Sequence, residues 1–386
     1  MKLVQGNSIQ LLKNGEALFP EVEAAIDAAK KDIRIETYIF DDDIAGTRIA
    51  NALIRAASRG VAVRLLVDGF GSAQTASVFF ANLAANGVQL AFYRPAHGWF
   101  DLRRSRVRRV HRKIVLVDGH VGFVGGINFI DDYTQCLSDT HPRYDYTVKI
   151  EGPILAEVYF SVSKLWRIVK LFSGKKNVRA RGQTLPEISQ KAKGSVTLAF
   201  VTRDNVGHRR DIEREYRHAI VTAKTEIIIV SSYFLPGRRL RNSLMRAAQR
   251  GVAVTVLLQG AADHPLLQYA TRSLYDKLLA SGIQIFEYHT AMLHGKVAVI
   301  DREWATVGSS NLDPFSLMLN REANIIALDK PFAETLRASI LDEISKNATQ
   351  LNFANWQKRN LWQRLQSWLG LLAARVASGV VGVKHD

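Results

Sequence analysis

Two segments of the chain place histidine, lysine and aspartate in one spacing, His-x-Lys-x-x-x-x-Asp, and they begin at His111 and at His294. Alternate residues of a strand project to the same face, so each histidine can enter a pocket together with Lys113 or Lys296. Each copy continues through an apolar run to a small-residue turn and an asparagine: Gly125-Gly126-Ile127-Asn128 and Gly308-Ser309-Ser310-Asn311. A lone histidine on an apolar strand is usually a core residue, but two matched copies indicate chemistry.

These residue types suit reactions of an anionic phosphodiester. Such a group resists attack, so its site must offer positive charge, a nucleophile and an acid for the departing oxygen. Two imidazoles can supply the nucleophile and the acid, while lysines and asparagines can stabilise the charge that develops on phosphate oxygens. The sequence contains no His-Glu-x-x-His pair and no Cys/His cluster, so we expect neither a metal nor another cofactor.

The elements that must position these segments recur in the same order in both halves. A β-like apolar run (33–40 or 227–235) leads through a helical stretch to an identical pentapeptide, Arg-Gly-Val-Ala-Val (59–63 or 250–254). Its glycine is typical of a helix C-cap, and its valines predict a buried parallel strand. A second helix and another strand (88–93 or 283–288) precede each histidine segment. This order predicts a tandem duplication of one βαβα unit.

Alternating strands and helices predict an α/β fold with a mixed, largely parallel sheet in each half. We expect a first domain over residues 1–172 and a second over 196–350. The glycine-containing basic segment 173–195 between them predicts a linker or insertion. Residues 351–386 form a tail rich in tryptophan and arginine.

Both copies match the signature of the phospholipase D superfamily, and the order of features resembles its bacterial cardiolipin synthases of the B type. The segments that carry this resemblance include the run "RIETYIFDDD" and the closing segment "LHGKVAVIDREWATVGSSNLDPFS". The resemblance implies two tandem domains with one shared active site at their interface. It also implies that His111 is the nucleophile and His294 the acid, although the symmetry of the copies allows the reverse. By the same resemblance, the phosphate-binding residues are Gly126, Asn128, Ser309 and Asn311.

A nucleophilic histidine must be held in one tautomer, usually by a carboxylate at its other nitrogen. The resemblance places this carboxylate downstream of each histidine, where Asp145 and Glu322 are the candidates. The motif aspartates Asp118 and Asp301 belong to the catalytic signature. Their positions at strand ends nevertheless favour a structural role in fixing turns over direct catalysis.

Composition points to an anionic partner. The 386 residues carry 52 Lys and Arg against 36 Asp and Glu, a formal charge of +16, which favours nucleic acid or an anionic membrane surface. The single cysteine, Cys136, favours a reducing compartment, and no apolar stretch reaches the length of a membrane-spanning helix. We therefore expect a cytoplasmic protein that is peripheral on the inner membrane.

Flanking residues help to choose between lipid and nucleic acid. The segment before the first histidine mixes aromatic and basic side chains, and the C-terminal tail has apolar residues at helical spacing opposite basic ones. The predicted membrane or anionic-lipid contacts are Trp99, Phe100, Arg103, Arg104, Arg106, Arg108, Arg109, Trp362 and Trp368. The same basic loop could bind DNA phosphates, and the tail helix could instead pack on the protein's own body.

The sequence thus predicts phosphatidyl transfer from one phospholipid to phosphatidylglycerol through a phosphohistidine, as in cardiolipin synthases. Phosphatidylglycerol is the expected substrate, with phosphatidylethanolamine as a further donor, and nucleic acid is not the expected partner. A phospholipase D-type hydrolase and a non-specific phosphodiesterase or nuclease remain the alternatives, because the histidine motifs define the reaction type and not the substrate.

Overall fold

The computed structural model describes residues 1–94, 108–133, 141–172, 188, 190–261 and 265–380. In the first half, strands and helices alternate up to β4 and are followed by three successive strands. The elements are β1 Val4–Lys13, α1 Asn14–Ala28, β2 Asp32–Thr37, α2 Ile44–Ser58, β3 Ala62–Asp68, α3 Ser77–Ala85, β4 Gln89–Tyr93, β5 Lys113–Val117, β6 Val121–Gly125, β7 Tyr146–Glu151 and α5 Leu155–Phe172.

The second half repeats this order with two helices in place of α3 and a short helix before its last long strand, and it adds a short strand and two helices at its end. The elements are β8 Val196–Arg203, α6 Asp211–Thr222, β9 Glu226–Ser231, α7 Arg238–Gln249, β10 Ala253–Gln259, α8 Pro265–Arg272, α9 Tyr275–Ala280, β11 Gln284–Tyr288, β12 Lys296–Ile300, β13 Trp304–Gly308, α10 Pro314–Met318, β14 Glu322–Leu328, α11 Lys330–Asn347, β15 Ala348–Gln350, α12 Phe353–Gln357 and α13 Leu361–Val380.

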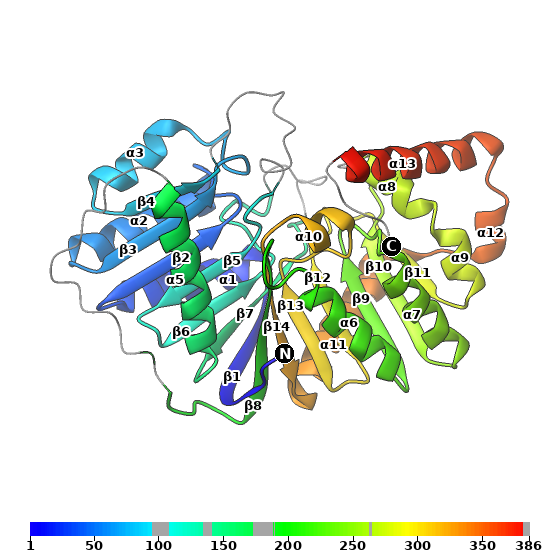
Figure 1. Ribbon diagram of the computed structural model, residues 1–386, viewed down its shortest axis with the longest axis horizontal. Helices are drawn as coiled ribbons and strands as arrows, with labels where there is room; N and C mark the ends of the chain where they lie inside the picture. Colours follow the sequence, from blue (N-terminus) through cyan, green and yellow to red (C-terminus); the bar gives the residue numbers. More distant parts are fainter. Residues whose placement is uncertain (95–107, 134–140, 173–187, 189, 262–264, 381–386) are drawn as a thin grey trace.

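The strands form one continuous sheet in the order β15-β11-β10-β9-β12-β13-β14-β8-β1-β7-β6-β5-β2-β3-β4 (Figure 1). Parallel pairing is found on each flank, in β2-β3-β4 and in β9-β10-β11, and the strands between the flanks run antiparallel. The predicted mixed α/β fold is confirmed. The alternation of strands and helices in the sequence did not predict the antiparallel strands at the centre of the sheet. At that centre, β1 pairs with both β7 and β8 and so joins the two halves.

The repeated pentapeptides adopt the predicted conformation. Gly60 and Gly251 have positive φ angles of 85° and 89° directly after α2 and α7, as a helix C-cap requires. The following strands, β3 and β10, pair in parallel with β2 and β9. Both flanks are therefore βαβ units whose strands end at the same edge of the sheet.

Helix α2 shows how the units pack. Its buried residues Ile49, Leu53 and Ala56 recur at helical spacing and face the core, and the carboxylate of Asp43 accepts a hydrogen bond from the N–H of Gly46 at the helix start. This aspartate belongs to the acidic triplet 41–43.

The predicted linker, 173–195, lies largely outside the described residues, so the domain boundaries stay a prediction.

Candidate functional site

The two histidines lie at the junction of the halves, and each backbone is held by the other half. The N–H of His111 donates to the carbonyl of Arg321 at 2.9 Å, and the N–H of His294 donates to the carbonyl of Tyr144 at 2.8 Å. Parallel β-bridges join the preceding residues, Val110 to Arg321 and Tyr144 to Leu293. The site therefore exists only where both halves meet.

Carboxylates cross this junction to reach the histidine rings. Nδ1 of His111 lies 3.0 Å from Oε2 of Glu322, and Nδ1 of His294 lies 2.5 Å from Oδ2 of Asp145. Each histidine therefore pairs with the carboxylate of the opposite half, and not with the carboxylate that follows it in its own half. A carboxylate at Nδ1 holds the proton there and leaves Nε2 of each ring as the reactive nitrogen.

Two buried lysines bring positive charge beside the rings. The ammonium of Lys113 donates to the carbonyl of His111 at 2.9 Å, and that of Lys296 donates to the carbonyl of His294. Burial, with Lys296 as a second cation nearby, lowers the pKa of Lys113 to about 7. Two buried ammonium groups so close together disfavour each other's charge, so the site favours an anionic ligand.

The same environment tunes the histidines and one acid. Burial lowers the pKa of His111, and burial together with the charges of Lys296 and Arg143 lowers the pKa of His294 well below its ordinary value. Burial raises the pKa of Asp145 to about 6. Both rings are therefore neutral near neutral pH until a negative charge enters the site.

Asn128 and Asn311 are both buried beside the histidine motifs. The side-chain oxygen of Asn128 accepts from the N–H of Ile39 at 3.2 Å, so its NH2 end is the end that it can offer to a phosphate. Oδ1 of Asn311 is buried with no hydrogen-bond partner among the described residues. Their phosphate contacts stay predictions.

Gly126 and Ser309 make contacts that differ from the phosphate binding predicted for them. The N–H of Gly126 donates to the carbonyl of Tyr146, and a Cβ at Gly126 would lie 2.3 Å from the carboxylate of Asp145. The hydroxyl of Ser309 donates to Glu322 at 2.5 Å, and the carbonyl of Ser309 lies 3.1 Å from Nδ1 of His111. Both residues help to place the carboxylates, and their phosphate binding stays a prediction.

The motif aspartates lie far from the rings. Each directly follows a five-residue strand that begins at the motif lysine, which places it roughly 16 Å from that lysine. The carboxylate of Asp118 accepts from the N–H groups of Lys30, Lys31 and Asp32. Asp301 accepts from the equivalent residues, Lys224, Thr225 and Glu226. These distances contradict a direct catalytic contact and agree with the turn-fixing interpretation.

Three further residues beside the rings were missed from the sequence. The ring of Tyr38 meets that of His111 edge-on, with 5.0 Å between centroids, and Arg143 adds a buried positive charge near His294. Arg321 supplies the carbonyl that holds His111. The two arginines could have been found from the sequence, because Arg321 directly precedes Glu322 and Arg143 lies two residues before Asp145.

The predicted lipid contacts divide into three groups. Trp99, Phe100, Arg103, Arg104 and Arg106 lie outside the described residues. Arg109 turns inward, stacking 4.7 Å from the ring centroid of Phe70 with a nitrogen 3.8 Å from Asp68, and the carbonyl of Arg108 accepts from Arg94. Neither of these two arginines is freely exposed.

Helix α13 carries the third group. Ser367 and Ala374 are buried on the side that packs against α8, whereas Trp362 and Trp368 are 64% and 57% exposed. Further apolar side chains share their exposure: Leu361, Leu365, Leu369, Leu372 and Val376. The helix therefore both packs on the protein body and leaves a large apolar face uncovered. No helix in the part of the chain that the structure describes is long and apolar enough to cross a membrane.

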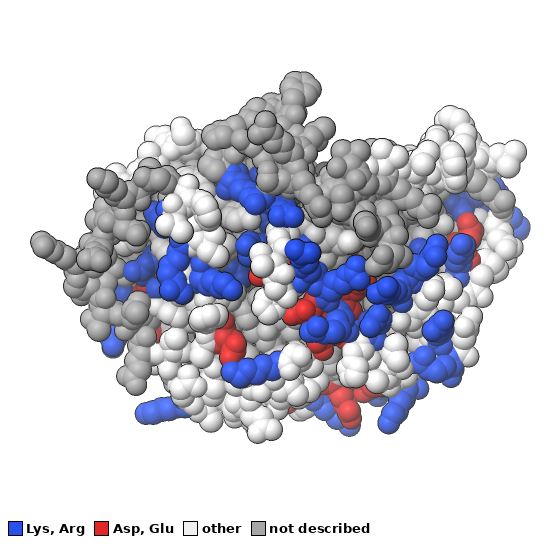
Figure 2. All heavy atoms as spheres, in the orientation of Figure 1, with Lys and Arg blue, Asp and Glu red and all other residues white. Residues whose placement is uncertain are grey.

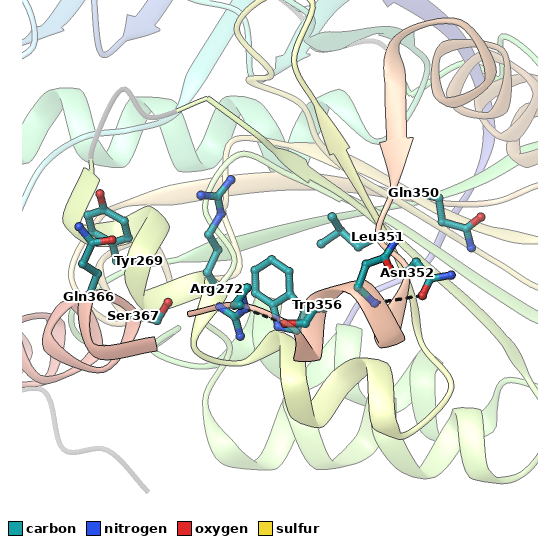
Figure 3. A pocket seen from close by; sticks show the side chains of 10 residues that line it. Tyr269, Arg272, Gln350, Leu351, Asn352, Trp356, Gln366 and Ser367 are labelled. Atoms are coloured by element: carbon teal, nitrogen blue, oxygen red, sulfur yellow. Dashed lines mark hydrogen bonds between the residues drawn. The ribbon is translucent and has the colours of Figure 1, made fainter. Parts of the chain in front are cut away.

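A cavity of about 500 Å³ lies beneath this C-terminal region (Figure 3). Its labelled lining includes Tyr269, Arg272, Trp356 and Ser367, from helices α8, α12 and α13. The guanidinium of Arg359 stacks on Trp356 and pairs with Asp276, and Arg272 pairs with Glu287. None of the lining residues belongs to the histidine site, so this cavity stands apart from the chemistry.

Comparison with known proteins places this geometry in a family context. Residues 22–160 and 216–343 match the family model described as "Cardiolipin synthase, PLD-like domain". Cardiolipin synthase B of Salmonella typhimurium is 40% identical over 98% of this chain and 90% of its own length, and that of Escherichia coli is 39% identical over the same shares. The solved structure of a phosphatidylserine synthase from Haemophilus influenzae has the same fold, with a TM-score of 0.72 at 16% identity over 97% of this chain and 95% of its own.

Proposed function

This chain belongs to the family of phospholipase D-like cardiolipin synthases, and from that membership we propose that it transfers a phosphatidyl group to the head-group hydroxyl of phosphatidylglycerol. The observation that supports this proposal best is the crossed pairing of each histidine with a carboxylate of the opposite half. It prepares two reactive Nε2 atoms for one phosphodiester between two lysines. The reaction needs a nucleophile and an acid, and the site has both.

In the first step, Nε2 of His111 attacks the phosphorus of a donor phospholipid. The bond from phosphorus to the head-group oxygen breaks, and that oxygen takes the proton from Nε2 of His294. Glu322 stabilises the positive charge that develops on His111, because its carboxylate accepts a hydrogen bond from Nδ1–H of the ring. The product is a phosphatidyl group bound to His111 through a P–N bond, together with a free alcohol.

The low pKa of His294 is compatible with its role as the acid once substrate is bound. A phosphodiester carries a negative charge, and its entry between Lys113 and Lys296 offsets the cations that disfavour protonation of the ring. The bound substrate therefore raises the pKa of His294. The enzyme gains its acid only when the group to be cleaved is in place.

In the second step, neutral His294 removes the proton from a hydroxyl of phosphatidylglycerol. The freed oxygen attacks phosphorus, the P–N bond breaks and His111 leaves as a neutral ring. Cardiolipin is the product when the acceptor is phosphatidylglycerol, and phosphatidic acid is the product when the acceptor is water. The proposed mechanism uses no metal and no cofactor.

We place the enzyme on an anionic membrane surface. The uncovered face of α13 offers tryptophan and leucine to the interface. Lysine and arginine side chains form a band across the face seen in Figure 2. Exposed arginines stand at the starts of α6 and α7, which follow strands that end beside the site: Arg209, Arg210, Arg238 and Arg239. Together these surfaces favour a phospholipid bilayer over a nucleic acid.

The decisive experiment incubates purified protein with labelled phosphatidylglycerol, with and without phosphatidylethanolamine, and identifies the products by mass spectrometry. We expect cardiolipin and, from the donor, glycerol or ethanolamine. Phosphatidic acid alone would make the protein a hydrolase. Cleavage of DNA without any lipid product would make it a nuclease and end the proposal.

The order of the histidines is tested separately. With His294 replaced by Ala, the intermediate should accumulate as a phosphatidyl group on His111, detectable by mass spectrometry of peptides after brief exposure to substrate. A stable adduct on His294 in the His111→Ala variant, and none on His111, would reverse the assignment.

A further inference from the structure

We propose that the cleft between α3, β4 and the end of α5 binds an acyl chain of the phospholipid whose phosphate lies at the histidines. The inference rests on the proposed function and extends it to the lipid tail. The cleft encloses about 1240 Å³, more than the roughly 300–1,000 Å³ typical of sites for drug-sized molecules. It is therefore large enough for a ligand of considerable bulk.

The walls of the cleft are mainly apolar. Ala81 and Ala84 line it from α3, Phe80 and Phe92 meet edge-on with 5.2 Å between ring centroids, and Ile168 and Phe172 complete it from α5. Alanines at the α3 wall keep the space open where longer side chains would fill it. Such a surface gains free energy by covering methylene groups and offers them few polar partners.

The rim of the cleft exposes unusually large apolar side chains. Phe172 is 83% exposed and Phe92 38%, and Val78 and Leu171 beside them are also exposed. Exposed large apolar side chains at the edge of an apolar cleft are typical of a binding site. Figure 1 shows the end of α5 lying beside β4 and below α3, and Phe92 and Phe172 both line the cleft between these elements.

One end of the cleft reaches the catalytic site. Arg321 lines the cleft, and its carbonyl accepts from the N–H of His111 at 2.9 Å. Tyr93, also in the lining, has its hydroxyl 3.4 Å from Nε of Arg321. A lipid whose phosphorus lies at His111 thus has its glycerol backbone close to this end, with the apolar walls running onward.

Charge is arranged to suit an amphiphile with an anionic head. The cations of the lining are Arg94, Lys170 and Arg321, and no acidic side chain is found among the described residues that line it. Arg321 lies at the end nearest the histidines, where ester and phosphate oxygens would be, and Arg94 stacks on Tyr93, whose hydroxyl contacts Arg321. The apolar remainder offers few groups that could bind the phosphates of a nucleic acid, whereas an acyl chain needs no polar partner there.

The test blocks the cleft with Ala84→Trp and compares it with Ala85→Trp, an exposed neighbour on α3 that does not line the cleft. Turnover is measured with long-chain phosphatidylglycerol in mixed micelles and with the soluble dihexanoyl form. We expect Ala84→Trp to raise KM for the long-chain substrate by about tenfold or more, since excluding two methylene groups suffices for that. The dihexanoyl kinetics and the Ala85→Trp variant should match the wild type.

Binding is measured independently of turnover. Phosphatidylglycerol with a parinaroyl chain is titrated into each protein, and the fluorescence of the chain is excited directly. Equal affinity and equal long-chain KM for the two variants would overturn the assignment of the cleft. If the wild type binds the probe in the cleft but makes no lipid product, the proposed function fails and the cleft remains.

Discussion

At the scale of single residues, the catalytic histidines depend on acids that lie far from them in sequence. Glu322 is itself fixed by the hydroxyl of Ser309, and Asp145 lies against a glycine that leaves room for its carboxylate. Each acid therefore has a defined position before substrate arrives. In the proposed mechanism, this preorganisation allows a neutral imidazole to attack a phosphodiester.

Removing the charge of either acid while keeping its shape should cripple catalysis. We expect Asp145→Asn or Glu322→Gln to lower kcat roughly 10²- to 10⁴-fold, because the ring loses both its tautomer and its counter-charge. Steady-state kinetics with dihexanoyl phosphatidylglycerol measure the change. Asp342→Asn, at an exposed carboxylate of α11, is the matched control and should behave as wild type. Unchanged kcat in both site variants would remove the acids from the mechanism.

The pH dependence of kcat/KM should be a narrow bell. Asp145, with a pKa of about 6, must be ionised and loses its charge as the pH falls through that value. Lys113, with a pKa of about 7, must be charged and loses its proton as the pH rises through that value. Lys113→Arg keeps its charge at high pH, so its alkaline limb should move upward. Initial rates at constant ionic strength test this, and a flat profile in the wild type would contradict it.

At the scale of elements, most of the strands and helices that position the site could be predicted from the sequence. Parallel strands, helix C-caps and the repeated order follow from local patterns of apolar residues and glycine, which the structure reproduces at β3 and β10. The antiparallel centre and the crossing of the acids could not be predicted in this way. They depend on contacts such as Tyr144 with Leu293, between residues about 150 positions apart, which no local pattern encodes.

The motif aspartates act on elements and not on substrate. Asp118 accepts three backbone N–H groups at the start of β2, and Asp301 does the same at the start of β9. We expect Asp118→Ala or Asp301→Ala to lower the free energy of unfolding by about 1–3 kcal/mol, because those donors lose a charged acceptor. Chemical denaturation measures this. The folded variants should keep kcat within about twofold of the wild type; a loss of kcat without a loss of stability would restore a catalytic role.

At the scale of the whole molecule, the surfaces that suit a membrane are distributed over both halves. The cleft beside α3 belongs to the first half, and α13 with its uncovered apolar face belongs to the end of the second. Figure 1 shows α3 and α13 at opposite ends of the same upper side of the molecule. An enzyme held at both ends would face the bilayer with the junction between the halves.

Helix α13 should contribute directly to membrane binding. Replacing Trp362 and Trp368 together by Ala is expected to weaken sedimentation with anionic vesicles by about tenfold or more, because two large exposed side chains lose their burial in the interface. Turnover of dihexanoyl phosphatidylglycerol should not change. The control is Phe160→Ala, an equally exposed aromatic residue near the start of α5. Equal loss in the control, or none in the double variant, would show that α13 does not dock on lipid.

The pairing of each histidine with a carboxylate of the opposite half also has a consequence during protein synthesis. A nascent chain that has left the ribosome only through the first half contains His111 and Asp145, but Glu322 and His294 have not yet been made. In such a chain, His111 lacks the carboxylate that fixes its tautomer, and Asp145 has no histidine to orient. In the proposed mechanism a truncated translation product therefore lacks a complete site, and we expect activity to begin only when synthesis has supplied both halves.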